Sequence, residues 1–232
     1  MAENLKEKTI KGLFWGAMNS GTTQLLNLVI GISLGRLIGP AEYGIVGVLT
    51  IFTLLAGNLQ SSGFSQGLVN LKAPQASDYN SVFWFNILAS FVIYTVLFFA
   101  APLIAAYIHE PCLIELSRFV FLSFVISSFG IAHNAYMTKN MMNREIAIIG
   151  AIALVCSGAV AITLAFLGFS YWSLAWQQII YIAVLNLGRY YFVPWRPSFH
   201  FTFEPVKRMF SFSVNVLITN IINTVSNNIL TL

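Results

Sequence analysis

The sequence predicts an all-α protein, a polytopic bundle of transmembrane helices, and three observations lead to that fold class. Of the 232 residues 57% are hydrophobic and 9% are charged, with a mean hydropathy of +0.77, whereas soluble domains carry about 25% charged residues. Seven apolar stretches approach the roughly 20 residues that cross a bilayer core. They lack the alternation of a membrane β-barrel, and backbone groups in hydrocarbon must be bonded internally, so each stretch is expected to be a helix.

The first three spans are expected at residues 13–34, 44–59 and 82–108. The first contains no Asp, Glu, Lys, Arg or His, so it suits the bilayer core along its whole length. Gly39-Pro40 follows it and predicts a tight turn, because proline blocks helix continuation. Trp84 lies near the start of the third span, as expected for an amphipathic ring at the headgroup level.

The other four spans are expected at residues 113–137, 146–167, 171–193 and 210–232. After the sixth span, Trp-Arg-Pro at 195–197 supplies an interfacial ring, a positive charge and a helix stop. The expected domains are a cytoplasmic N-terminus (1–12), an N-terminal lobe of six transmembrane helices (13–193), a cytoplasmic connection (194–209) and a seventh transmembrane helix (210–232). The last apolar run reaches Leu232 with no anchor after it, so we expect this helix to be truncated and the chain to be a fragment of a longer transporter-like protein. A real seven-helix protein is the alternative.

The distribution of Lys and Arg predicts which way the bundle faces. With the N-terminus in the cytoplasm, ten positive residues lie inside and two, Arg36 and Arg118, lie outside. The inner residues are Lys6, Lys8, Lys11, Lys72, Lys139, Arg144, Arg189, Arg196, Lys207 and Arg208. Because cytoplasmic segments carry the excess of positive charge, the N-terminus is expected to be cytoplasmic. The net charge of +4 is then a topology signal and does not indicate nucleic-acid binding.

Polar side chains inside the spans are candidates for lining a cavity. They are Ser20, Thr23, Gln24 and Asn27 in the first span, His133 and Asn134 in the fourth, and Asn220, Asn223 and Asn227 in the seventh. Polar groups in a bilayer tend to face a bundle interior or a watery cavity, so a hydrated cavity is the functional interpretation. The alternative is close helix packing with amides bonded across helices. For His133 a hydrogen-bonded packing role is favoured over proton transfer.

Arg118 is the candidate contact for an anionic headgroup. It lies a few residues into the fourth span and three residues after Glu115, so both share one helix face. A cation there suits a phosphate or an acidic sugar, whereas an interfacial ion pair with Glu115 is the alternative. Arg189, near the inner end of the sixth span, is interpreted as a positive-inside anchor.

The acidic residues argue against several classes of protein. None of the eight Asp and Glu lies in the middle of a span, which weakens a simple cation-coupled antiporter because buried carboxylates are the usual proton or sodium relays. The sequence also lacks the carboxylate pairs or His clusters of a membrane hydrolase or metal enzyme, a phosphate-binding loop and a dinucleotide fingerprint. It therefore predicts no catalytic residues, no metal site and no cofactor.

Three stretches together resemble a known transporter family. They are the outer turn Gly35-Arg36-Leu37-Ile38-Gly39-Pro40-Ala41-Glu42-Tyr43-Gly44, the exit Ser62-Gly63-Phe64-Ser65-Gln66-Gly67-Leu68, and the opening Tyr171-Trp172-Ser173-Leu174-Ala175-Trp176-Gln177 with Trp-Arg-Pro-Ser-Phe at 195–199. From about Lys8 to its last residue the chain resembles the polysaccharide transporter family, the lipid-linked oligosaccharide flippases of the O-antigen and colanic-acid exporter type. That family belongs to the multidrug/oligosaccharidyl-lipid/polysaccharide exporter superfamily. The chain departs from the family pattern at Ser61, where members often carry an acidic residue.

The resemblance implies two six-helix lobes that rock around a central cavity, of which this chain supplies the N-terminal lobe and the first helix of the other. It further implies flipping of an undecaprenyl-diphosphate-linked oligosaccharide across the bacterial inner membrane, for surface polysaccharide or lipopolysaccharide biosynthesis. The expected partners are this lipid-linked glycan, membrane lipid and other glycan-assembly membrane proteins, with no nucleic acid. The alternatives are a cation-coupled multidrug antiporter of the same superfamily and an inactive remnant or accessory membrane scaffold.

Overall fold

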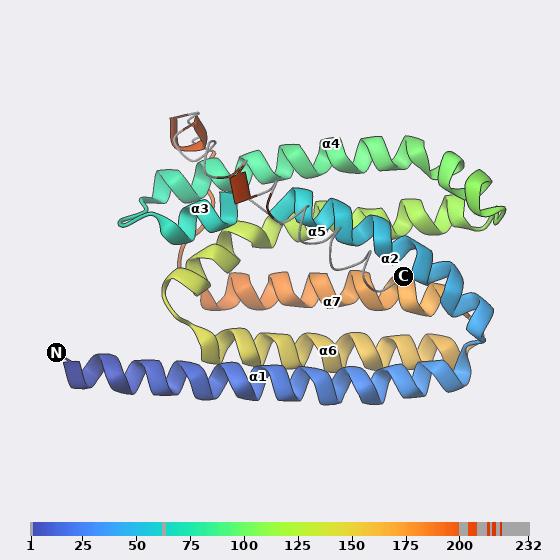
Figure 1. Cartoon of the computed structure of the whole chain (residues 1–232), viewed down its shortest axis with the longest axis horizontal. Helices are drawn as coiled ribbons and strands as arrows, with labels where there is room; N and C mark the ends of the chain where they lie inside the picture. Colours follow the sequence, from blue (N-terminus) through green and yellow to red (C-terminus); the bar gives the residue numbers. More distant parts are fainter. Residues whose placement is uncertain are drawn as a thin grey trace.

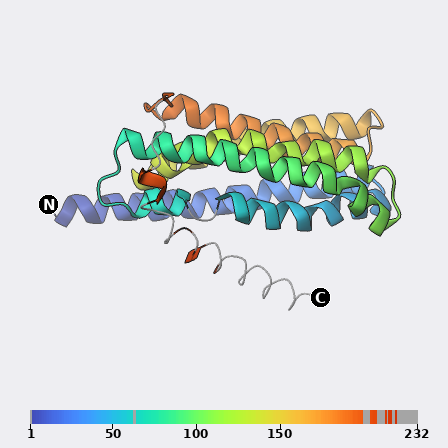
Figure 2. The same ribbon diagram turned by 90° about the horizontal axis from the view of Figure 1, so that it is seen from above.

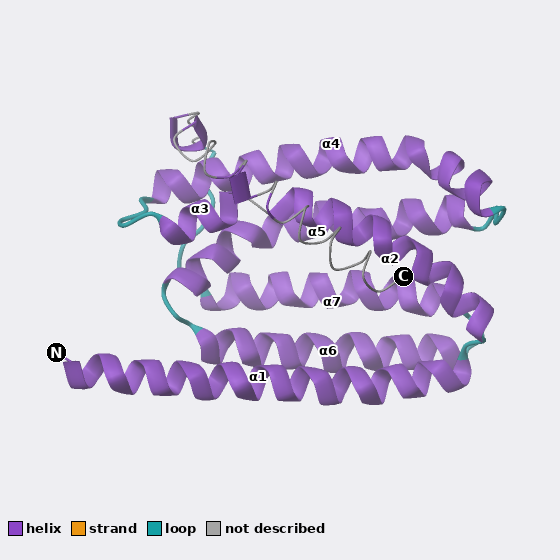
Figure 3. Cartoon of the chain, in the orientation of Figure 1, coloured by secondary structure: helices purple, strands orange, loops and turns teal. Residues whose placement is uncertain are grey.

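The computed structural model describes residues 2–61, 64–199 and 204–207 and the single residues 213, 215, 216 and 219. Within these ranges the chain is helical and contains no strand (Figure 3). The helices are α1 (Ala2–Leu37), α2 (Pro40–Ser61), α3 (Phe64–Asn70), α4 (Ala76–Ile108), α5 (Leu113–Lys139), α6 (Asn143–Phe166) and α7 (Tyr171–Phe192). The fold is therefore the expected all-α helix bundle, while the expected seventh span falls on residues of which only four are described.

The helix bounds differ from the expected spans mainly on one side of the membrane core. The segment expected as an N-terminal tail is helical, because α1 begins at Ala2. Helix α4 begins at Ala76, before the expected residue 82, and its first turn is held by a hydrogen bond of 2.8 Å from the Gln75 amide to the Asp78 carboxylate. The short helix α3 was not expected.

The helices pack side by side in the order α4, α5, α7, α6 and α1, and α2 lies across α5 and α7 (Figure 1). In the perpendicular view the long helices remain nearly parallel (Figure 2). Glycines allow close approach along this row: a Cβ at Gly158 would lie 2.5 Å from the Ile30 side chain, and one at Gly188 would lie 2.6 Å from Ile149. These contacts join α1 to α6 and α6 to α7.

By length and composition, three of the described helices are apolar enough to cross a membrane: α4, α5 and α6. Helix α4 leaves large apolar side chains exposed, as expected of a surface that faces lipid: Phe91 is 59% exposed, Phe99 72% and Leu103 73%. Helices α1 and α7 fall outside this group and contain polar residues such as Asn27 and Gln178 within their lengths. Helix α7 borders both cavities described next, and α1 borders one of them.

Candidate functional site

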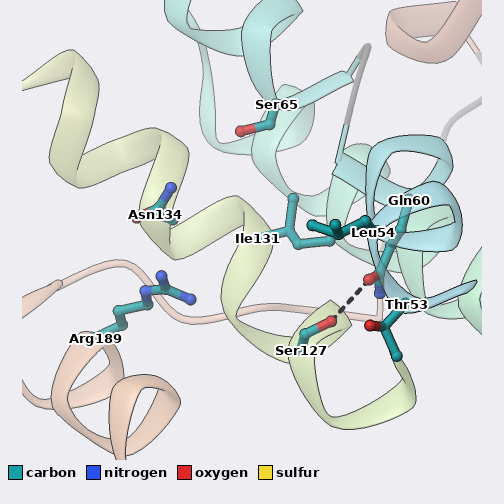
Figure 4. A pocket seen from close by; sticks show the side chains of 9 residues that line it. Thr53, Leu54, Gln60, Ser65, Ser127, Ile131, Asn134 and Arg189 are labelled. Atoms are coloured by element: carbon teal, nitrogen blue, oxygen red, sulfur yellow. Dashed lines mark hydrogen bonds between the residues drawn. The ribbon is translucent and has the colours of Figure 1, made fainter. Parts of the chain in front are cut away.

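A cavity of about 370 Å³ lies between α2, α3, α5 and α7 (Figure 4). We call it the inner cavity because it lies towards the end of the bundle where α1 begins, and we call the cavity nearer the opposite end the outer cavity. Its described lining consists of Thr53, Leu54, Gly57, Gln60, Ser65, Ser127, Ile131, Asn134 and Arg189. The helical period places Thr53, Gly57 and Gln60 on one face of α2. Arg189 is the charged member of this lining, and amide and hydroxyl groups supply most of the remaining polar surface.

Gln60 fixes the wall that α2 contributes to the inner cavity. Its Nε2 donates to Ser90 Oγ and to the Phe124 carbonyl, each at 2.5 Å, and its Oε1 accepts from Ser127 Oγ at 2.8 Å. The side chain is buried, with 8% exposure. A buried amide with these partners joins α2 to both α4 and α5, so it holds the cavity wall in place.

Arg189 reaches the inner cavity through a close approach of α5 and α7. A Cβ at Gly130 would lie 1.9 Å from Asn186 Oδ1 and 2.8 Å from Arg189 Nη1, so glycine leaves the space that these two side chains fill. Arg189 Nη1 donates to Asn186 Oδ1 at 3.3 Å, and Asn186 Nδ2 donates to the Ile126 carbonyl. No Asp or Glu in the described ranges forms an ion pair with Arg189. Among the described residues, the cavity therefore presents a guanidinium without an acidic partner.

An outer cavity of about 350 Å³ lies between α1, α2, α6 and α7. Its described lining is Asn27, Val46, Leu154, Ser157, Leu174, Gln177, Gln178 and Tyr181, none of which is charged. Leu174, Tyr181 and Arg189 share one face of α7 by the helical period, so this face borders both cavities. The two cavities thus lie along one seam between α2 and α7 and differ in charge.

The structure distributes the predicted cavity residues over several environments. Asn27 lines the outer cavity and Asn134 lines the inner one. Ser20 and Gln24 are exposed, Thr23 is half-buried, and all three line neither cavity. The residues Asn220, Asn223 and Asn227 lie outside the described part of the chain.

His133 packs among aromatic rings and lines neither cavity. Its ring is 0% exposed and lies 4.0 Å from the Tyr190 ring, 5.0 Å from that of Trp195 and 6.3 Å from that of Phe83, measured between centroids. Neither ring nitrogen has a hydrogen-bond partner among the described residues. Rings from α4, α7 and the segment after α7 thus surround the imidazole, and the predicted hydrogen-bonded packing role of His133 stays a prediction.

Arg118 is held by α4 and lies apart from both cavities. Its guanidinium lies 4.1 Å from the centre of the Phe98 ring, and its Nε donates to the Phe98 carbonyl at 3.5 Å. Within the described ranges Glu115 and Arg118 form no ion pair, so that alternative is wrong. The ring face attracts the cation through its quadrupole, and this contact turns Arg118 towards α4.

Sequence reasoning identified Asn27 and Asn134 but missed the other polar residues of the two cavities, Arg189 and Gln60 among them. Arg189 was interpreted as an anchor because it lies near a span end, and Gln60 lies just beyond the expected end of the second span. A signal was present in α7, where Gln178, Tyr181 and Arg189 share one face at helical spacing. An analysis of the helix faces of the sixth span, in addition to the depth of each residue in the membrane, would have identified Arg189 as a candidate cavity residue.

Comparison with known proteins identifies the family of this chain. A family model described as "Polysaccharide biosynthesis protein" matches residues 33–232. The chain is 25% identical to the lipopolysaccharide biosynthesis protein WzxC of Escherichia coli K12 over 99% of its length and 47% of that protein. It is 26% identical to the succinoglycan biosynthesis transport protein ExoT of Rhizobium meliloti over 97% of the chain and 46% of that protein.

A third relative is the teichuronic acid biosynthesis protein TuaB of Bacillus subtilis, 24% identical over 97% of the chain and 47% of that protein. The chain thus spans about half the length of these curated relatives. No solved structure matches the chain. Since the family model covers most of the helical bundle, the chain belongs to the polysaccharide biosynthesis protein family of multi-pass membrane proteins.

Proposed function

We propose that this chain takes part in export for polysaccharide biosynthesis, as a transporter and not as an enzyme. Its substrate is an undecaprenyl-diphosphate-linked oligosaccharide, which is flipped across the bacterial inner membrane for surface polysaccharide or lipopolysaccharide assembly. The names of WzxC and ExoT, a lipopolysaccharide biosynthesis protein and a transport protein, support this assignment.

The observation that carries the proposal is Arg189 in the inner cavity. A guanidinium binds two phosphate oxygens through parallel N–H donors, which suits a diphosphate. The Asn134 amide, which lines the same cavity, adds hydrogen-bonding capacity beside it. In this proposal Arg189 takes the headgroup role that the sequence analysis gave to Arg118, because Arg118 lines neither cavity.

The chemistry of the cavities favours a glycan carrier over a cation-coupled multidrug antiporter. No Asp or Glu is found among the described residues that line either cavity. Carboxylates at membrane depth are the usual relays for protons or sodium. Hydroxyl and amide groups instead match the donors and acceptors of a sugar.

We also propose the orientation in which the N-terminus is cytoplasmic. The N-terminus of α1, the α3–α4 and α5–α6 connections and the C-terminal end of α7 gather at one end of the bundle (Figure 1). Lys72, Lys139 and Arg196 belong to these segments, whereas Arg36 and Arg118 belong to the opposite end. Positive residues mark the cytoplasmic side, so the inner cavity opens near the cytoplasmic leaflet, where the substrate is loaded.

The experiment compares the two arginines in the gene that encodes this chain in its host. Arg189→Gln is expected to lower surface polysaccharide at least about tenfold and to cause lipid-linked oligosaccharide to accumulate, since a charged hydrogen bond contributes roughly 1.5–3 kcal/mol. Arg118→Gln is the matched control and is expected to export normally at equal membrane levels. Normal export by Arg189→Gln, or a greater loss with Arg118→Gln, would contradict the proposal.

A further inference from the structure

The outer cavity offers hydrogen bonds without charge. Five of its described lining residues are polar and neutral: Asn27, Ser157, Gln177, Gln178 and Tyr181. At about 350 Å³ the cavity falls within the range of ligand pockets, roughly 300–1,000 Å³. The cavity is therefore large enough for a small polar group. None of these lining residues carries a charge that would neutralise an ionised ligand.

The hydrogen bonds of these residues leave capacity for a ligand. Gln178 Nε2 makes one long contact, to Ser123 Oγ at 3.4 Å, and Ser157 Oγ donates to the Leu154 carbonyl at 3.2 Å. A glutamine side chain offers two N–H donors and an oxygen with two lone pairs. Hydroxyl groups both donate and accept, so a polyol pairs with amides in either direction.

Apolar groups complete the lining. Val46, Leu154 and Leu174 lie beside the amides, and Tyr181 presents both a ring and a hydroxyl. A pyranose has the same two-sided character, with C–H groups on its faces and hydroxyls around its edge. Ligand pockets commonly combine apolar walls with a few convergent polar groups in this way.

We propose that the outer cavity is a binding subsite for an uncharged pyranose and that it discriminates against uronic acids. A carboxylate placed there would give up part of its hydration without meeting a cation among the described lining residues, which disfavours it relative to a neutral sugar. The subsite depends on the proposed function, because the sugar belongs to the glycan whose diphosphate binds at Arg189. Tyr181 and Arg189 are eight residues apart on α7, about 12 Å along the helix axis, so the glycan follows the seam from one cavity to the other.

The test measures binding to the purified chain in detergent micelles by titration calorimetry. The probes are cellobiose, cellobiouronic acid, which is the same disaccharide with one carboxylate, and inorganic pyrophosphate. The variants are Gln178→Arg and, as the matched control, Gln66→Arg at an exposed glutamine of α3 that lines neither cavity. Gln177→Arg replaces Gln178→Arg if that variant does not fold.

We expect the unmodified chain to bind cellobiose at least about tenfold more tightly than the acid, as polar sites reject mismatched ligands strongly. Gln178→Arg should reverse this preference, and Gln66→Arg should keep it. Equal affinities for the two disaccharides, no binding of cellobiose, or an unchanged preference in Gln178→Arg would overturn the subsite. Pyrophosphate separates the two proposals, because Arg189→Gln should weaken its binding and leave cellobiose binding intact. If Arg189→Gln leaves pyrophosphate binding unchanged, the proposed function fails. The sugar preference is then decided separately, by the affinities for the two disaccharides.

Discussion

Arg189 and Arg118 belong to opposite ends of the bundle and have different surroundings. Arg118 lies against the Phe98 ring and donates to a carbonyl of α4, so its partners come from the protein. Arg189 lines a polar cavity, and its described side-chain partner is the neutral Asn186. The first arrangement attaches α5 to α4, whereas the second leaves positive charge available to an anion. Depth along a span therefore says less about the role of an arginine than the helix face on which it lies.

The largest effect is expected from filling the space between α5 and α7 behind Arg189. Gly130→Val places carbon atoms where Asn186 and Arg189 now lie, and overpacking of this kind typically costs about 1–3 kcal/mol. The free energy of unfolding in a reversible detergent titration measures the loss. Gly47→Val is the matched control, since a Cβ at Gly47 meets nothing within 4 Å. Equal stability of the two variants would mean that α5 and α7 do not pack closely at this point.

A smaller effect is expected from removing the buried amide that holds α2. Gln60→Leu removes the donor to Ser90 Oγ and one of the donors to the Phe124 carbonyl, which Ser127 Oγ still bonds at 3.0 Å, at a cost of about 1–2 kcal/mol. The same titration should show this loss, while Gln66→Leu at the exposed position on α3 should change stability little. Unchanged stability of Gln60→Leu would show that α2 is held by other contacts.

The smallest change in stability is expected at the Arg118 contact. Arg118→Ala removes a cation–π interaction at a half-buried site, which contributes roughly 0.5–1 kcal/mol. Arg118→Lys keeps the charge near the ring and should lose less. If Arg118→Ala lowers the free energy of unfolding more than Gln60→Leu does, Arg118 stabilises the bundle through more than its contact with Phe98.

Thiol labelling assigns the two ends to the two sides of the membrane. Cys112 lies just before α5, at the end that carries Arg118, and Cys156 lies within α6. A membrane-impermeant maleimide applied from outside should label Cys112 and spare Cys156. Burial, with a smaller contribution from Glu110, raises the pKa of the Cys112 thiol, so less thiolate is present at neutral pH. Labelling should therefore accelerate as the pH rises above neutral, because the thiolate is the reactive form. Labelling of Cys112 only after the inner face is opened would reverse the proposed orientation.

The sequence was sufficient for the fold class and for most helix bounds, because both follow from local physical rules. The turn expected at Gly39-Pro40 lies between the end of α1 at Leu37 and the start of α2 at Pro40. The helical N-terminal segment and α3 were missed because the search was for long apolar runs. Polar residues and glycine still form helix where a neighbouring helix extends through them or packs against them.

The site was harder to predict, because a cavity is a property of several helices together. The polar stripe of the first span ran through residues 20, 24 and 27, but of these Asn27 is the one that lines a described cavity. The side of α1 that faces α6 includes the buried residues Ile30 and Leu34. The periodicity of one helix does not specify which neighbouring helix covers each of its faces. The different roles of Arg118 and Arg189 could therefore be recognised only from their contacts in the folded bundle.

The most direct test of the central claim is the affinity of the purified chain for inorganic pyrophosphate, measured for the unmodified chain and for Arg189→Gln and Arg118→Gln under the same conditions. If the inner cavity holds the anionic headgroup, Arg189→Gln should weaken binding at least about tenfold, the range of a lost charge-assisted contact. Arg118→Gln should stay within about twofold, because its guanidinium is already engaged by Phe98. Equal weakening in both variants, or loss in Arg118→Gln alone, would contradict the assignment of the headgroup to Arg189.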